Sequence, residues 1–238
     1  MKIPLERLFD EKIAVCQPVE GYRMNLDPVL LAAHIAHLRA ENTLDVGCGC
    51  GILGVLMLKS GACAKYTGIE IQPELAECAE KTISENRLQA AVIKGDIREF
   101  RKLFKHGEFD LIISNPPFYK KGGGRINPHE SKARARHEID LTANELFAAV
   151  KYLMSKNGRA FILYNAERTR EIDLAINDAG LGISSLRFIH PFAGRRAESV
   201  IFEIVHSRAR ELRIEPPFVV YESEGKYSCQ LRDFLSNL

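Results

Sequence analysis

A glycine-rich turn that directly follows a short apolar stretch limits what this chain can fold into more than any other feature. The turn spans residues 45–51 and reads D-V-G-C-G-C-G, after the apolar stretch 43–46 and before an apolar helical stretch, 51–60. Glycines at such positions allow a tight backbone turn and let a ligand lie close to the N-terminus of the following helix. The pattern therefore predicts a strand–turn–helix unit with a cofactor bound at the turn.

Short apolar stretches alternate with helical patterns along most of the chain. Strand and helix alternate five times, which predicts a parallel sheet with helices on both faces. Only a short loop separates the last two strands, too short for a parallel crossover, so the last strand should run antiparallel. We predict an α/β fold with a seven-stranded, mostly parallel, Rossmann-like sheet. Its strands are expected at residues 43–46, 66–69, 91–93, 109–113, 159–164, 183–189 and 200–205.

Three helix ends carry local signals. Asp27 precedes Pro28 at the start of a helix expected to run to about Leu38, and its carboxylate is predicted to cap that helix. The segment T-A-N-E at 142–145 has the form of a capping box, which begins a helix that extends to about residue 154. Gly180 is expected to end the helix at 167–179.

Composition narrows the class of protein. The chain has a net charge of +2, and its six cysteines include no C-x-x-C pair, so we expect no metal site and reduced thiols, as in the cytoplasm. No apolar run reaches the length of a membrane span, and we expect no membrane partner. Residues 1–238 are expected to form a single domain, with 1–40 as an N-terminal extension and helix and 207–238 as a tail packed on the domain. The sequence leaves the oligomeric state open.

Acidic residues follow each of the first three predicted strands. Asp45 precedes the first glycine, Glu70 ends the second strand and Asp96 follows the third. A carboxylate at position 45 suits the ammonium group of a methionine moiety and would repel a pyrophosphate. Glu70 can bind ribose hydroxyls in either cofactor, and Asp96 can accept from an adenine amine. This row of acids favours S-adenosylmethionine over a nicotinamide dinucleotide.

The fourth predicted strand ends in Asn115-Pro116-Pro117-Phe118, the most specific signal in the chain. Two consecutive prolines lack amide hydrogens and make the backbone rigid, so their carbonyls and the Asn115 side-chain oxygen form a set of fixed acceptors. Two acceptors that bind the hydrogens of a planar amine would direct its lone pair toward a methyl sulfonium, and Phe118 would stack on the flat acceptor. The pattern predicts methyl transfer to an sp2 nitrogen.

A basic, glycine-containing segment follows this motif at once. It holds a single acid, Glu130, and three consecutive glycines, 122–124. Its position beside the acceptor motif predicts contacts with the phosphates of a nucleic acid. The predicted RNA-binding residues are Lys120, Lys121, Arg125, Arg134, Arg136 and His137.

The motifs D-V-G-C-G-C-G, I-E-I-Q, G-D-I and N-P-P-F, in this order, resemble the class I methyltransferases that act on amino groups. The resemblance is closer to the bacterial tRNA1(Val) adenine-N6 methyltransferases, through residues 22–28, 135–138 and 216–221. It implies S-adenosylmethionine as the cofactor and, as substrate, the adenosine 3′ to the anticodon of a tRNA. It also implies that Arg23 and Asp27 close over the cofactor. The expected cofactor-binding residues are Arg23, Asp45, Gly47, Cys48, Gly49, Gly51, Glu70, Ile71, Asp96, Ile97 and Asn115.

Other readings of the same motifs remain. An N-P-P-[FY] motif also serves the methylation of a glutamine amide in a protein such as a release factor, although such enzymes usually carry a helical domain before the catalytic one. Methylation of a base in rRNA or DNA uses the same chemistry. A non-catalytic RNA-binding protein that kept the fold would not need both motifs, and a nicotinamide oxidoreductase leaves N-P-P-F and Asp96 unexplained.

Overall fold

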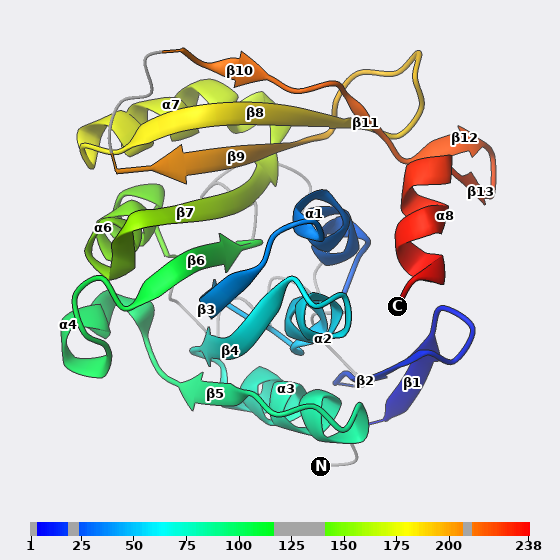
Figure 1. Cartoon of the computed structure of the whole chain (residues 1–238), viewed down its shortest axis with the longest axis horizontal. Coiled ribbons are helices and arrows are strands. Elements are labelled where there is room, and N and C mark those ends of the chain that lie inside the picture. The colour runs from blue at the N-terminus through cyan, green and yellow to red at the C-terminus, as the bar shows by residue number, and fades with distance from the viewer. Residues whose placement is uncertain (1–3, 19–23, 117–140, 207–210) are drawn as a thin grey trace, which may run out of the picture.

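The computed structural model describes residues 4–18, 24–116, 141–206 and 211–238. Within these ranges the main sheet has nine strands, in the order β10-β8-β9-β7-β6-β3-β4-β5, and β11 also pairs with β8 (Figure 1). The strands are β3 (Ala40–Val46), β4 (Cys63–Glu70), β5 (Ala91–Lys94), β6 (Phe109–Ser114), β7 (Met154–Asn165), β8 (Gly182–His190), β9 (Ser199–Val205), β10 (Arg213–Ile214) and β11 (Phe218–Val219).

The seven predicted strands are confirmed as β3 to β9. The pairs β3/β4, β4/β5, β3/β6 and β6/β7 are parallel, whereas β9 runs antiparallel between β7 and β8, as the short last connection requires. Strands β10 and β11, two residues each, were not predicted. They lie in the C-terminal tail and extend the sheet by pairing parallel with β8.

Helices cover both faces of the sheet, and the strands supply each face with alternate residues. Leu111 and Ile113 of β6 join the cluster under α1, α2 and α3, whereas Ile112 joins the cluster under α4, α6 and α7. This period of two, in strands buried on both faces, explains their nearly continuous apolar runs. The helices are α1 (Asp27–Ile35), α2 (Ile52–Lys59), α3 (Pro73–Glu85), η1 (Ile97–Glu99), α4 (Phe100–Leu103), α6 (Ala143–Leu153), η2 (Ala166–Arg168) and α7 (Thr169–Asp178).

Two of the three predicted helix ends are confirmed, and one prediction is wrong. Thr142 and Glu145 form the expected capping box, and Gly180, with φ of 70°, follows α7. Asp27, however, makes no capping hydrogen bond. Leu26 already has helical backbone angles and takes the N-cap position, so Asp27 is the first helical residue, and its carboxylate accepts from Asn25 Nδ2 at 2.6 Å.

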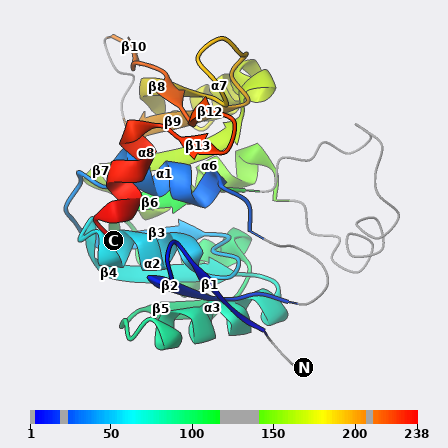
Figure 2. The same ribbon diagram turned by 90° about the vertical axis from the view of Figure 1, so that its right-hand side faces the viewer.

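The two ends of the described chain pack on the same helical layer. The N-terminal hairpin, β1 (Leu5–Leu8) and β2 (Ile13–Cys16), lies against α3, where Thr82 Oγ1 accepts from the Cys16 amide at 2.9 Å. The C-terminal hairpin, β12 (Tyr221–Ser223) and β13 (Lys226–Tyr227), leads into α8 (Cys229–Ser236). Helix α8 lies beside α1, as both views show (Figures 1 and 2).

Candidate functional site

A cavity of about 250 Å³ opens at the C-terminal ends of β3, β4, β5 and β6. Ligands of open α/β sheets bind at this end, where the strand order reverses, and β6 lies beside β3 at that point. The cavity brings together residues from all the predicted motifs that the structure describes. The predicted residues that line it are Asp45, Gly47, Cys48, Gly49, Glu70, Ile71, Asp96, Ile97, Asn115 and Pro116.

Of the other predicted residues, the structure describes only Gly51, which does not line this cavity. Gly51 is the N-cap of α2, with φ of 81°, and a Cβ there would lie 3.0 Å from the Ala79 backbone, so this glycine is required by close packing of α2 and α3. The others lie outside the described residues. They are Arg23, Pro117, Phe118, Lys120, Lys121, Arg125, Arg134, Arg136 and His137.

The glycine turn presents open backbone to the cavity. Gly47 has φ of 73°, and a Cβ added there would meet nothing within 4 Å, so the space beside it is free. Cys48 and Cys50 in the same turn are buried, and burial raises the pKa of the Cys50 thiol to about 12. Both cysteines remain protonated, and the turn offers backbone groups and apolar thiols rather than charge.

Asp45 is the most deeply buried acid of the cavity, with 1% of its surface exposed. Its carboxyl group accepts a hydrogen bond from the Tyr66 hydroxyl at 2.6 Å. Burial raises the pKa of Asp45 to about 7, and the bond from Tyr66 only partly opposes this shift. Tyr66 in turn packs under Gly54, where a Cβ would come within 2.3 Å of the tyrosine ring. Among the described residues, Asp45 therefore has a neutral partner and no cation.

Glu70 links the end of β4 to the glycine turn. One carboxylate oxygen accepts from the Gly49 amide and the other from the Gln72 amide, each at 2.9 Å. Burial raises the pKa of Glu70, and these backbone hydrogen bonds oppose the shift. The carboxylate is therefore oriented at the cavity wall by two backbone donors, an arrangement that fits a group that binds a sugar diol.

Asp96 sits at the rim rather than deep in the cavity. It caps η1 by accepting from the Arg98 amide at 2.9 Å, and the Arg98 guanidinium also donates to its carboxylate. These hydrogen bonds lower the pKa of Asp96. The acid is therefore ionised and part of its accepting capacity is already used, which leaves its expected contact with an adenine amine as a prediction.

Asn115 closes the cavity at the end of β6. The preceding residue, Ser114, donates its hydroxyl to the Val46 carbonyl at 2.7 Å and so joins the ends of β6 and β3. Among the described residues that line the cavity, Asn115 Oδ1 is the only buried side-chain oxygen or nitrogen without a hydrogen-bond partner. An unpaired buried acceptor costs about 1–3 kcal/mol, which indicates that a ligand donor completes it.

Sequence reasoning missed several residues of the site. Tyr66 was assigned only to a strand, because nothing in its spacing shows that its hydroxyl meets Asp45. Gln72 and Leu75 follow the Glu70 motif closely and could have been found by extending it along α3. The other unpredicted lining residues are Met24, Asn25, Pro28, Val46, Cys50, Ile52, Leu53, Gly95 and Leu141.

Two kinds of feature are absent from the described residues. Across 4–18, 24–116, 141–206 and 211–238, no group of three or more His, Cys, Asp or Glu side chains is arranged to hold a metal ion. In the same ranges, none of the helices has the length and apolar character needed to cross a membrane.

Comparisons with known proteins agree with this geometry. The sequence profile of the methyltransferase small domain family matches residues 24–174. A protein of Vibrio cholerae named tRNA1(Val) (adenine(37)-N6)-methyltransferase is 31% identical over 222 residues, which is 90% of this chain and 88% of that protein. A protein of the same name from Shewanella sediminis is 27% identical over 223 residues, covering 89% of this chain and 90% of the relative.

The fold also occurs in solved structures. A predicted O-methyltransferase from Agrobacterium tumefaciens superposes with a TM-score of 0.70 at 20% identity, covering 88% of this chain and 95% of the other. The cavity fits S-adenosylmethionine, because open glycine backbone, an oriented glutamate and an unpaired amide oxygen meet in it. The chain belongs to the methyltransferase small domain family and is an S-adenosylmethionine-dependent methyltransferase.

Proposed function

We propose that this enzyme methylates the exocyclic N6 amine of an adenine in tRNA, at the adenosine 3′ to the anticodon of a tRNA1(Val)-like substrate. The names of relatives that align over about nine-tenths of the chain support the substrate. The unpaired Oδ1 atom of Asn115 is the observation that carries the chemistry. It is a fixed acceptor, at the end of β6, in the cavity proposed to hold the methyl donor.

An adenine amine is a poor nucleophile because its lone pair is delocalised into the ring. Asn115 Oδ1 would accept one hydrogen of this amine, and the Pro116 carbonyl, next in the chain, would offer a second acceptor. Both interactions favour a pyramidal nitrogen whose lone pair points along the line of transfer. The bound cofactor supplies an activated methyl group on a sulfonium. The N–C bond would form as the S–C bond breaks, and the amine, held by Asn115 and Pro116, would then lose a proton to solvent.

The cofactor contacts are likewise a proposal. Glu70 has an oriented carboxylate for the ribose hydroxyls, and the Gly47–Gly49 backbone borders free space for the methionine portion. Asp45, which has no cationic partner among the described residues, would meet a positive group of the cofactor. Phe118 and the basic residues from Lys120 to His137 stay predicted contacts of the adenine and the RNA, because they lie outside the described residues.

The test is transfer of a labelled methyl group from S-adenosylmethionine to unmodified bacterial tRNA, followed by nuclease digestion to nucleosides. We expect the label in N6-methyladenosine, and only in tRNA whose residue 3′ to the anticodon is adenosine. A synthetic tRNA1(Val) with guanosine at that single position is the matched substrate control and should take no label. Because the proposed substrate is a tRNA, we expect the reaction to occur in the cytoplasm.

Two other results would redirect the proposal. Label in a protein fraction, with none in tRNA, would assign the acceptor clamp to a glutamine amide. Label in tRNA at a nucleoside other than N6-methyladenosine would keep the RNA substrate and overturn the proposed acceptor atom.

A further inference from the structure

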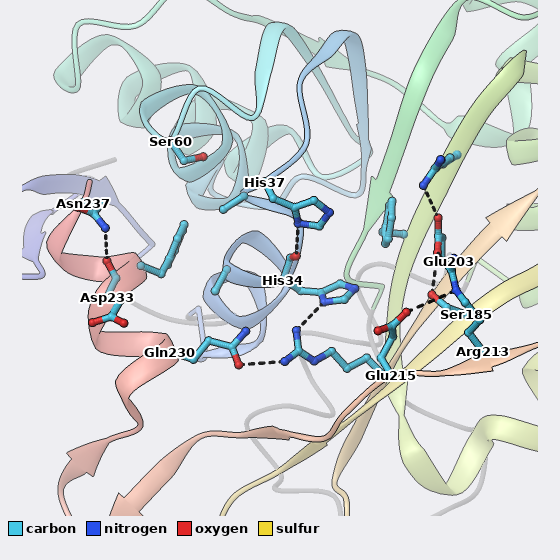
Figure 3. Close-up of a pocket in the computed structure, with 16 residues that line it drawn as sticks. His34, His37, Ser60, Ser185, Glu203, Arg213, Glu215, Gln230, Asp233 and Asn237 are labelled. Atoms are coloured by element: carbon cyan, nitrogen blue, oxygen red, sulfur yellow. Dashed lines mark hydrogen bonds and ion pairs between the residues drawn. The ribbon is translucent and has the colours of Figure 1, made fainter.

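A second and larger cavity, of about 610 Å³, lies away from the glycine turn. It is bounded by the C-terminal end of α1, by α8, and by β7, β9, β8 and β10. Figure 3 shows His34 of α1 and Gln230 of α8 facing each other across it, with Ser185, Glu203 and Arg213 grouped on the strand side. The strand register explains that group, because Glu203 lies opposite Ser185, which in turn lies opposite Arg213.

The charges on the strand side are compensated. Glu203 is buried, and its two carboxylate oxygens accept from Arg159 at 2.8 Å and from Arg213 at 3.2 Å. The Ser185 hydroxyl donates to the same carboxylate at 2.7 Å. Glu215 lies 3.6 Å from Arg213. The two arginines of this group are therefore matched by two acids, and their guanidinium groups are largely exposed.

Arg187 differs, because its guanidinium is half-buried and bonded only to neutral acceptors. Its Nε donates to the Pro216 carbonyl at 3.1 Å, Nη1 to His34 Nδ1 at 3.1 Å and Nη2 to Gln230 Oε1 at 2.9 Å. Its carbon Cζ also lies 4.9 Å from the centre of the Phe218 ring. Within the described part of the chain, Arg187 forms no ion pair with a carboxylate.

The surroundings compensate the charge of Arg187 only in part. Burial lowers the pKa of Arg187, and Glu215 only partly opposes the shift. Burial, followed by the charge of Arg187, lowers the pKa of His34 to about 4, so His34 is neutral and accepts through Nδ1. Asp233, the remaining acid of the cavity, lies further along α8 than Gln230 (Figure 3). A half-buried cation whose hydrogen-bond acceptors are all neutral is stabilised by an anion that joins it.

We propose that this second cavity binds the phosphate group of a nucleotide, with Arg187 as the anion-binding residue. A guanidinium has five N–H donors; three are used, so two remain for an anion. Its planar fork matches phosphate oxygens. The walls of the cavity include the aromatic rings of Phe161, His34 and Phe234, against which a base can lie. The ring centres of Phe161 and His34 are 5.8 Å apart. Its volume is that of a nucleotide-sized site.

The nucleotide has two sources, a free nucleotide or a residue of bound RNA. The RNA source rests on the proposed tRNA substrate, whereas the free nucleotide requires neither tRNA nor methyl transfer. Both share the same chemistry at Arg187, so one set of variants tests both. Methyl transfer by the unaltered enzyme is measured alongside, because its failure would count against the proposed function and not against this cavity.

The first arm measures AMP binding by calorimetry, with S-adenosylhomocysteine saturating the glycine-turn cavity. In the native protein, Gln230 Oε1 lies 2.9 Å from Arg187 Nη2. Gln230→Glu puts a carboxylate at this position, which neutralises Arg187 and leaves its contacts to Pro216 and Phe218 in place. We expect this variant and Arg187→Gln to weaken AMP binding at least tenfold. Arg213→Gln removes the same charge from the same cavity but from a paired arginine, and we expect a change of threefold or less.

The second arm measures the affinity of unmodified tRNA at several salt concentrations. If the phosphate belongs to RNA, Gln230→Glu lowers the salt slope by about one, as for loss of one phosphate contact, and AMP binds weakly in all variants. If the phosphate belongs to a free nucleotide, tRNA affinity is unchanged and AMP binding is lost. The inference is overturned if Gln230→Glu changes neither affinity, or if AMP binds tightly and adenosine, which has no phosphate, binds just as tightly.

Discussion

Each of the two cavities contains a buried acid, and the surroundings shift the pKa values of these two acids in opposite directions. Asp45, beside the glycine turn, has a neutral tyrosine as its partner, and burial raises its pKa to about 7. Glu203, beneath the second cavity, is also buried, but Ser185 and two arginines overcome the effect of burial and lower its pKa.

The difference indicates which charge each cavity still lacks. In the glycine-turn cavity Asp45 has no cationic partner among the described residues, and the methyl donor of this family carries positive charge. The second cavity has its buried acid, Glu203, paired with two arginines, whereas Arg187 has no ion-pair partner among the described residues. In both places the unmatched group predicts the sign of the ligand, because the protein leaves uncompensated the charge that the ligand will balance.

The largest expected effect comes from Asn115→Ala, which separates the two cavities by function. We expect kcat for methyl transfer to fall by about 10²–10³-fold, as when one oriented hydrogen-bond partner of a reacting group is lost. The affinity for S-adenosylhomocysteine and for AMP should change by less than about threefold. Ser114→Ala, which removes only the hydroxyl bonded to Val46, is the matched control and should retain most activity. Near-normal turnover in Asn115→Ala would rule out the acceptor clamp.

The next largest effect tests how closely Tyr66, the hydrogen-bond partner of Asp45, packs under α2. In Gly54→Ala the new methyl group would collide with the Tyr66 ring, and overpacking of this kind costs about 1–3 kcal/mol. We expect a fall of about 2–3 kcal/mol in the free energy of unfolding, measured with urea. Gly194→Ala is the matched control, since a Cβ there meets nothing within 4 Å. Equal stability of the two variants would contradict the close packing of Tyr66 under α2.

A third prediction concerns the charge of Asp45. Its folded pKa of about 7 lies above the unfolded value, so the stability it contributes is fully present below pH 3.8 and is lost as the pH rises through about 7. The ammonium group of the cofactor, which S-adenosylhomocysteine keeps, would favour the ionised form of Asp45, and binding below pH 7 should therefore release a proton. We expect the affinity for S-adenosylhomocysteine to rise about tenfold between pH 6 and pH 8.

Calorimetry in buffers of different ionisation enthalpy measures that proton directly. At pH 6 we expect release close to one proton per cofactor, and at pH 8.5 almost none. Asp45→Asn should bind without this dependence. Binding at pH 6 that is independent of the buffer would show that Asp45 does not ionise with the cofactor.

The smallest expected effect is the loss of stability on substitution of Glu203, whose charge is compensated by two arginines. Glu203→Gln removes a hydrogen-bonded charge whose arginine partners are largely exposed, so we expect a loss of about 1 kcal/mol at pH 7. Because its folded pKa is lowered, the contribution of Glu203 is present above the unfolded pKa of about 4.3 and is lost as the pH falls through the folded value. Urea unfolding of both proteins at pH 7 and at pH 3 measures the loss of stability and its dependence on pH.

The control for this prediction is Glu222→Gln, which alters an acid with two cationic partners at an exposed site. We expect no measurable change in stability there, because solvent screens such pairs. A Glu203→Gln variant that is equally stable at pH 7, or equally pH-dependent, would remove the contrast between the two buried acids.

Much of the fold was predictable because it follows from local rules. The glycine turn, the capping box at Thr142 and the period of two in β6 each depend on a few neighbouring residues. The short strands β10 and β11 were missed because two residues carry no period, and they form only where the tail meets the edge of β8. Asp27 was assigned a cap that Leu26 occupies, since the exact first turn depends on backbone angles.

The cofactor site was predictable to the extent that it follows strand ends. Asp45, Glu70 and Asn115 were placed together because the C-terminal ends of parallel strands meet at one edge. Tyr66 was not predicted as a site residue, because its contact with Asp45 depends on side-chain packing between two strands. The second cavity was not predicted, because its wall is formed by α1, α8 and four strands. The register that brings these strands together cannot be inferred from any single segment of the sequence.

Helix α1 has a consequence for the energetics of the whole enzyme. It is nine residues long, about 13 Å, with Pro28 at the glycine-turn cavity and His34 at the second one. If a ligand at one end shifts this helix, the affinity of the cavity at the other end changes with it. Thermodynamic reciprocity then requires the two ligands to alter each other's dissociation constants by the same factor.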